Sequence, residues 1–245
     1  PVRGYGTRAL VQEARAVPTT VPPDVTPVTA GDRWISNGIL SVHADGAGRV
    51  RLTSAAHALD IPDLVGFEDV GDRGDTYTHS PVGRVISDAR LTSLRVLHRG
   101  PLRGALAATW SIRVPAALRK PGEGEEAALP GRSGRPVDIA VNVVFELDAG
   151  AGFVRLRVSG RNDARDHRLR IVLRTGVAGA THHADAAFGP VERAPLEVPS
   201  EDQQAETPPP TAPLHRWVTR ANARHGVALV SGWLAEYEAT DVGTL

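Results

Sequence analysis

Hydrophobic and polar residues alternate with a period of two over much of this chain. In FVRLRVSG, which begins at Phe153, three aliphatic residues share one side and two arginines share the other. HRLRIVLRTG, which begins at His167, repeats this arrangement. Because successive side chains of a strand point to opposite faces, the pattern predicts strands with one buried and one solvated face.

Similar alternation predicts further strands at residues 7–17, 34–44, 48–55, 88–99, 105–114, 137–147 and 226–239. Turn sequences separate several of them and indicate hairpins: DGAG at 45–48, GPLRG at 100–104 and DAGAG at 148–152. No segment sustains the 3.6-residue apolar spacing of a helix, and AAHALDIPDL holds at most a short helical turn before Pro62. We therefore predict an all-β fold, specifically a large antiparallel β-sandwich.

Two stretches interrupt the strand pattern. Residues 119–136, RKPGEGEEAALPGRSGRP, are rich in glycine, proline and charge, and we expect a mobile hairpin loop there. Residues 194–213 are acidic and proline-rich, and we expect them to cross the surface without pairing into a sheet. A proline-rich stretch at 18–27 follows the first predicted strand and separates it from the body of the chain.

These interruptions suggest the domain limits. We expect residues 1–30 to be the end of a preceding β-segment with a proline-rich linker, and residues 31–245 to be one β-sandwich domain. The chain contains no methionine and stops straight after an apparent strand. We interpret it as a piece of a longer protein.

The composition narrows the range of partners. The 245 residues suffice for a substantial core, and 28 basic residues balance 28 acidic ones, so nothing indicates a nucleic-acid or membrane-surface partner. The chain has no cysteine, which excludes a disulfide, a thiolate nucleophile and a sulfur-based zinc site. This composition fits a reducing compartment, and we expect a cytoplasmic location. No apolar run approaches the ~20 residues that cross a bilayer, and no signal peptide is visible.

Residues 67–81, FEDVGDRGDTYTHSP, concentrate acids and glycines beside Tyr77, one of only three tyrosines. Three interpretations stay open. Glycine and aspartate are sufficient for a structural turn. The acids could also supply oxygen ligands to calcium, although their spacing differs from that of an EF-hand loop. Alternatively, Tyr77 could offer its ring and hydroxyl at the rim of a sugar site.

Other candidate chemistry is weaker. His182 and His183 are adjacent, so on a strand they would point to opposite faces and could not easily hold one metal ion; we predict no metal site. Glycoside hydrolysis needs two converging carboxyl groups, and the sequence does not show which acids converge. We assign no catalytic residue within this chain, and no phosphate-binding loop or G-x-S-x-G motif occurs.

Four segments occur in an order that resembles one family. They are NGILSVHADGAGRVRLTS, FEDVGDRGDTYTHSP, HRLRIVLRTG leading to ADAAFGPVER, and HRWVTRANARHGVALVSGWLAEYEA. Together they resemble the C-terminal β-domain of glycoside hydrolase family 38, the retaining α-mannosidases. The GDRGDTY form is most similar to the bacterial branch, which includes mannosylglycerate-type hydrolases. The resemblance extends from about Trp34 to the end of the chain.

The resemblance implies a supersandwich similar to galactose-mutarotase-like folds, preceded in the parent protein by an α/β barrel and a helical bundle. In the family the barrel carries zinc, an aspartate nucleophile and an acid/base carboxylate, and none of those motifs lies in this chain. The resemblance thus implies a zinc-dependent parent enzyme that cleaves α-mannosidic bonds, with the barrel as intramolecular partner. The chain alone is then expected to be inactive and to bind no zinc.

The resemblance also implies roles for individual residues. Tyr77 with Pro81 matches a Y-x-x-x-P stretch whose tyrosine contributes to the sugar pocket, and Arg193 follows the D-x-x-F segment of ADAAFGPVER as a second substrate-binding candidate. Asp72 and Asp75 are expected to shape the loop near the site rather than to touch sugar. The alternative is an autonomous carbohydrate-binding or scaffolding sandwich with no catalytic partner.

Overall fold

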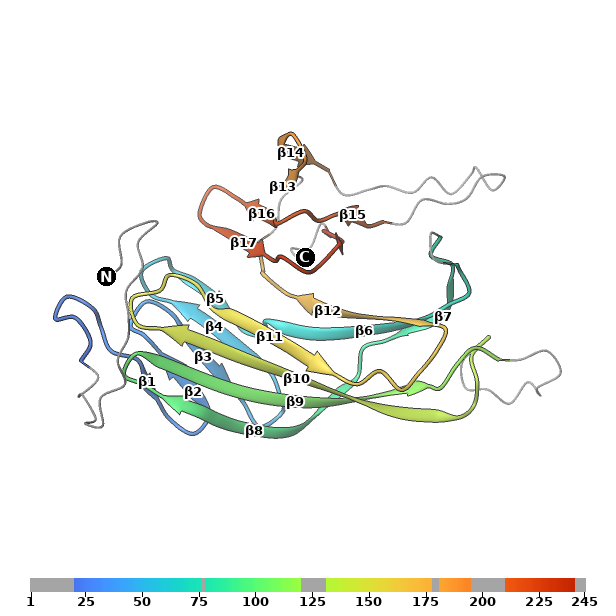
Figure 1. Ribbon diagram of the computed structural model, residues 1–245, viewed down its shortest axis with the longest axis horizontal. Coiled ribbons are helices and arrows are strands. Elements are labelled where there is room, and N and C mark those ends of the chain that lie inside the picture. The colour runs from blue at the N-terminus through green and yellow to red at the C-terminus, as the bar shows by residue number, and fades with distance from the viewer. Residues whose placement is uncertain (1–19, 76–77, 120–130, 178–180, 195–209, 241–245) are drawn as a thin grey trace, which may run out of the picture.

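The computed structural model describes residues 20–75, 78–119, 131–177, 181–194 and 210–240. Every regular element within these ranges is a β-strand, and every strand pair is antiparallel (Figure 1). This confirms the predicted all-β, antiparallel class. The strand predicted at residues 7–17 lies outside the described part of the chain.

The first sheet has the order β1-β2-β3-β4-β5. Its strands are β1 (Thr29–Ala30), β2 (Trp34–Ser36), β3 (Ser41–Ala44), β4 (Val50–Ser54) and β5 (Leu59–Ile61). The single strand predicted at 34–44 is wrong at its centre, because Asn37 forms a turn there. Its side-chain oxygen accepts hydrogen bonds from the backbone N–H groups of Ile39 and Leu40, at 3.1 and 2.8 Å.

The second sheet has the order β11-β10-β9-β8 and contains the longest strands. They are β8 (Ala89–Arg99), β9 (Arg103–Pro115), β10 (Pro136–Asp148) and β11 (Arg155–Gly160). The predicted turns at 45–48, 100–104 and 148–152 connect β3 to β4, β8 to β9 and β10 to β11, so all three predicted hairpins are confirmed.

The third sheet joins segments that are far apart in the sequence. Its order is β12-β6-β7, with β6 (Val65–Asp72), β7 (Pro81–Ile86) and β12 (His167–Leu173). The register places Leu173 opposite Val65 and His167 opposite Gly71. β6 is the middle strand of the three, and most of its side chains are buried.

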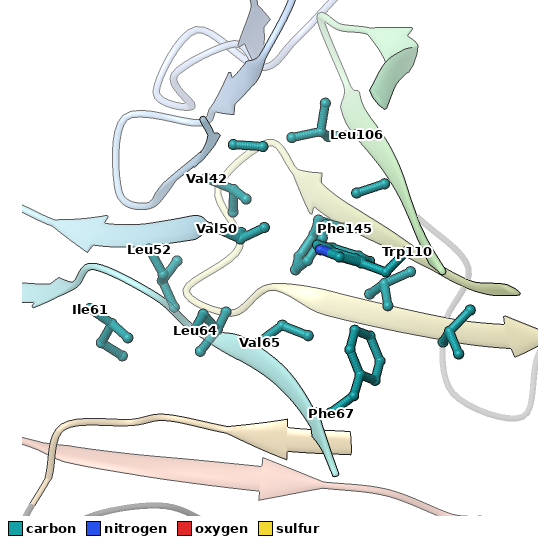
Figure 2. Close-up of a cluster of buried hydrophobic side chains, with 14 of the residues drawn as sticks. Val42, Val50, Leu52, Ile61, Leu64, Val65, Phe67, Leu106, Trp110 and Phe145 are labelled. Atoms are coloured by element: carbon teal, nitrogen blue, oxygen red, sulfur yellow. The ribbon is translucent and has the colours of Figure 1, made fainter. Parts of the chain in front are cut away.

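The main core is filled by side chains from the first and second sheets and from β6 (Figure 2). Phe67 and Trp110 pack with their ring centroids 5.5 Å apart. The Trp110 indole also donates a hydrogen bond to the Gly48 carbonyl, at 3.3 Å. Leu106 and Phe145 are fully buried in the same cluster. The alternating residues of β9 and β10 thus supply nearly half of the buried residues of this core.

A smaller unit surrounds a second core on the β12 side of the molecule (Figure 1). Its four-stranded sheet has the order β14-β13-β16-β17, with β13 (His182–Ala186), β14 (Gly189–Arg193), β16 (Trp217–Ala221) and β17 (Gly226–Val230). A two-stranded pair, β15 (Ala212–Pro213) and β18 (Glu236–Tyr237), completes it. The expectation that residues 194–213 stay unpaired is therefore wrong at Ala212 and Pro213; residues 195–209 lie outside the described ranges.

Ion pairs join the smaller unit to β12. Arg168 contacts Glu236 at 2.5 Å, and Arg170 contacts both Glu238 and, at 2.8 Å, Glu68 of β6. The arginines on the polar side of β12 are therefore paired with acids of the neighbouring unit. The described strands surround two cores, so the finer assignment to one large supersandwich stays a prediction, as do the limits at residues 1–30 and 31–245.

A buried ionic network joins the base of the 119–136 segment to the third sheet. Asp69 contacts Arg132 at 2.5 Å and His167 through Nδ1, and all three side chains are at most 1% exposed. The second ring nitrogen of His167 lies 2.9 Å from the Asn162 side-chain oxygen. Leu118 and Arg132 form a β-bridge, so both flanks of this predicted loop are held in place; residues 120–130 lie outside the described chain.

Candidate functional site

The loop that contains Tyr77 is held by its own polar groups. Tyr77 itself lies outside the described residues, and its role stays a prediction. The Asp72 carboxylate accepts hydrogen bonds from the backbone N–H groups of Gly74 and Ser80, both at 2.9 Å. The Asp75 carboxylate accepts another from Thr78, also at 2.9 Å. These contacts fix the loop on both sides of the tyrosine.

Two further features support this geometry. A Cβ atom at Gly74 would lie 1.6 Å from the Thr78 carbonyl oxygen, so only glycine fits at this close backbone approach. Burial alone would raise the pKa of Asp72. The His79 ring, 3.0 Å away, and the two backbone donors outweigh burial and lower that pKa below its ordinary value. Asp72 is therefore a charged anchor of the loop.

Arg193, the second predicted substrate-binding residue, lies at the end of β14 and packs on Tyr237. Its guanidinium donates hydrogen bonds to the Tyr237 hydroxyl and to the Pro213 carbonyl, at 3.1 and 3.2 Å. It also lies 6.0 Å from the centroid of the tyrosine ring, in cation–π contact. On the other side, His182 Nε2 lies 2.8 Å from the same hydroxyl, and the two rings meet edge to face at 89°.

These three side chains line a cavity of about 290 Å³. Small and apolar residues around β15 form much of the remaining wall. The Nδ1 atom of His182 is buried and has no hydrogen-bond partner among the described residues. The site thus offers a guanidinium, a phenol and an imidazole to a small polar ligand.

The β13–β14 hairpin explains this arrangement. His182 pairs directly with Arg193 across the hairpin, so both side chains face the smaller core. His183 pairs with Glu192 and is exposed on the opposite face. No group of three or more histidines and acids suited to a metal ion occurs in the part of the chain that the structure describes.

The described residues bring Arg193 together with His182 and Tyr237, but not with Asp72 or Asp75. Strand β14 and the loop between β6 and β7 lie well apart in Figure 1. Sequence reasoning missed His182 as a site residue and did not consider Tyr237. The hairpin pattern in HHADAAFGPVER could have placed His182 opposite Arg193, whereas nothing local indicates Tyr237.

Protonation of His182 should weaken the fold. Burial is the main reason why its pKa lies below the ordinary value of 6.5, and the nearby charge of Arg220 adds to the effect. The unfolded chain therefore binds a proton on this residue at a higher pH than the folded chain does. We expect the free energy of unfolding to fall as the pH drops below about 6.5, and to fall less steeply in His182→Gln.

Urea denaturation at several pH values between 7.5 and 5 measures this difference. His98→Gln is the matched control, because its side chain is exposed on β8 and is not among the charges that lower the pKa of His182; it should behave as the wild type does. Identical slopes for the wild type and His182→Gln would contradict the assignment.

No helix in the described ranges is long and apolar enough to span a bilayer. No protein-family model matches the chain. In sequence, the chain is 28% identical over 182 residues to a putative mannosylglycerate hydrolase from Halalkalibacterium halodurans. This match covers 70% of the chain and 20% of the relative, so the chain spans about a fifth of the length of the curated relative it matches.

In structure, the chain is similar to two solved structures from Enterococcus faecalis. A crystal structure of an α-mannosidase from strain V583 matches with a TM-score of 0.76 at 19% identity, over 89% of this chain and 26% of that one. A protein of glycosyl hydrolase family 38 matches with a TM-score of 0.77 at 18% identity, over 95% of this chain and 27% of that one. Sequence and fold together confirm the resemblance to glycoside hydrolase family 38, the α-mannosidases, that the four segments predict.

Proposed function

We propose that the chain is the C-terminal β-domain of a longer glycoside hydrolase that cleaves α-mannosidic bonds with retention of configuration. The sequence similarity to a putative mannosylglycerate hydrolase is the observation that carries this proposal. The match to about a quarter of two longer solved chains fits a domain of a larger enzyme. In this proposal the domain is a supersandwich of the galactose-mutarotase type and belongs to a cytoplasmic protein.

The catalytic machinery belongs to a barrel that packs against this domain. In this proposal zinc is held in the barrel, as the resemblance to glycoside hydrolase family 38 implies. A barrel alone leaves one side of a sugar site open to water. The β-domain closes that side with hydrogen bonds that strengthen as the sugar approaches an oxocarbenium-like transition state.

Tyr77 and Arg193 are the residues through which the domain would act. A tyrosine hydroxyl donates a hydrogen bond to a sugar without adding a charge near the metal. Arg193 is held by Tyr237 and by the Pro213 carbonyl, so its guanidinium is already oriented before substrate arrives. Preorganised donors of this kind contribute to catalysis because they need no reorganisation during the reaction.

In the full-length enzyme, Tyr77→Phe is expected to lower kcat about tenfold and to change KM less. This corresponds to about 1.4 kcal/mol of transition-state stabilisation, the size of one hydrogen bond that forms fully only in the transition state. Steady-state kinetics on an aryl α-mannoside measures it. Arg95→Ala, an exposed change on β8, is the control and should leave both constants unchanged. An unchanged kcat in Tyr77→Phe would remove Tyr77 from the mechanism.

The second candidate function is an autonomous carbohydrate-binding or scaffolding domain. The cavity around Arg193 favours it, since His182, Arg193 and Tyr237 all come from this one chain. The coding sequence upstream of Pro1 discriminates the two. A barrel with closely spaced histidine and aspartate metal ligands supports the enzyme, whereas a stop or an unrelated domain supports the autonomous domain.

A further inference from the structure

A groove of about 500 Å³ lies on the main body of the molecule, separate from the Arg193 cavity. It opens where the β3–β4 turn, β6, the β7–β8 connection and parts of β9 and β10 meet. Four arginines line it: Arg49, Arg90, Arg113 and Arg174. Three aspartates, Asp63, Asp88 and Asp138, lie among them. We call this site the Arg–Asp groove.

One side of the Arg–Asp groove depends on a glycine, Gly66, which leaves room for an arginine side chain. The guanidinium of Arg174 lies over Gly66, where a Cβ atom would come within 2.2 Å of its terminal nitrogen. Arg174 is held there by Asp63, at 2.6 Å, and by the Val65 carbonyl, at 3.4 Å. Any larger residue at position 66 would displace this guanidinium. Glycine therefore allows a fixed donor to lie along the groove.

Other charged groups of the groove are available to a ligand. Arg113 and Asp138 are 3.9 Å apart, and both side chains are more than half exposed. Arg90 and Asp88 form no side-chain hydrogen bond or ion pair with any residue in the described ranges. Arginine offers only donors and aspartate only acceptors, so each neighbouring pair presents both functions to one ligand.

This arrangement suits a neutral sugar better than an anion. Vicinal hydroxyl groups both donate and accept, so they match a guanidinium beside a carboxylate. Arg49 pairs with Asp45, and Arg174 pairs with Asp63. Arg113 lies 3.9 Å from Asp138. The arginines are therefore balanced by carboxylates and give a polyanion little net attraction. The volume lies within the range of small-molecule sites, about 300–1,000 Å³.

We propose that the Arg–Asp groove binds a neutral oligosaccharide through its vicinal hydroxyl groups. The groove is distinct from the Arg193 cavity, and its function does not depend on the presence of a catalytic barrel. In a longer enzyme it would hold a part of a glycan away from the bond that is cleaved. In an autonomous domain it would be a binding site in its own right.

Isothermal titration calorimetry of the 245-residue chain with α-linked mannotriose tests this proposal. The double variant Arg90→Ala/Arg113→Ala is expected to bind at least tenfold more weakly than the wild type. Arg84→Ala/Arg95→Ala is the matched control: it removes the same charge from exposed positions on β7 and β8 outside the groove, and it should bind normally. Thermal unfolding of all variants checks that they are folded.

Three results would overturn the proposal. The first is the absence of heat from millimolar mannotriose with the folded wild-type chain. The second is normal binding by the groove variant together with loss of binding in Arg193→Ala, which would move the sugar to the other cavity. The third is displacement of mannotriose by inorganic sulfate at lower concentration than the sugar itself, which would make the groove an anion site.

Discussion

Replacement of Asp69 by alanine is expected to lower the free energy of unfolding by about 3–5 kcal/mol, the usual cost of leaving a buried charge without its partner. Asp69 is completely buried and contacts both Arg132 and His167. Without it, the Arg132 guanidinium would remain inside the protein with no carboxylate to balance its charge. Two nitrogens of Arg132 already lack a hydrogen-bond partner within the described ranges. No nearby group there is therefore placed to replace the lost carboxylate.

Urea denaturation at pH 7 measures this effect, and Asp60→Ala is its control. Asp60 pairs with Arg51, but both side chains are about half exposed, at 51% and 54%. Exposed pairs contribute about 0–1 kcal/mol, because water solvates the partner that remains. Asp69→Asn separates charge from shape, since it keeps the size of the side chain and removes its charge. Equal losses in Asp69→Ala and Asp60→Ala would show that the buried network does not stabilise the fold.

Replacement of Trp110 by alanine is expected to destabilise the chain by about 3–5 kcal/mol. Trp110 is 3% exposed and packs against Phe67 between strands β9 and β6. Its removal leaves a cavity that these long, paired strands cannot close, and it removes the donor to the Gly48 carbonyl. Trp233→Ala provides the comparison, because that ring is 97% exposed.

Equilibrium unfolding followed by circular dichroism measures both tryptophan variants. The Trp233 variant should lie within about 0.5 kcal/mol of the wild type, as is usual for surface changes. A loss in Trp110→Ala no larger than that in Trp233→Ala would contradict the location of the main core.

The hairpins could be predicted from the sequence because their determinants are local. Alternation identifies these strands, and glycine with aspartate or proline identifies the turns, so β8, β9 and β10 were expected close to where they lie. Asn37 breaks the predicted strand at 34–44 with a signal that is also local, because Asn-Gly is typical of a tight hairpin turn, and the strand prediction overlooked it. The Asn37 amide group donates to the carbonyls of Asp148 and Ala151, more than a hundred residues away, and no local signal shows such partners.

Burial also depends on neighbours that the sequence does not reveal. Alternation placed Val158 on the buried side of its strand, yet it is 49% exposed. Strand β11 forms one edge of its sheet, so its faces are only partly covered. At the candidate site, Arg193 was predicted by resemblance. Tyr237 was not predicted, because it comes from a different strand pair that folds back over the hairpin.

The pairing of β12 with β6 has a consequence for synthesis of the protein in the cell. Val65 and Leu173 are paired, so roughly a hundred residues must leave the ribosome after β6 before its partner exists. At about 5–20 residues per second this takes about 5–20 seconds. During that interval a strand destined for the interior has one unpaired edge. The segment from Val65 to Asp72 would therefore stay open to chaperones that bind nascent chains until β12 has been made.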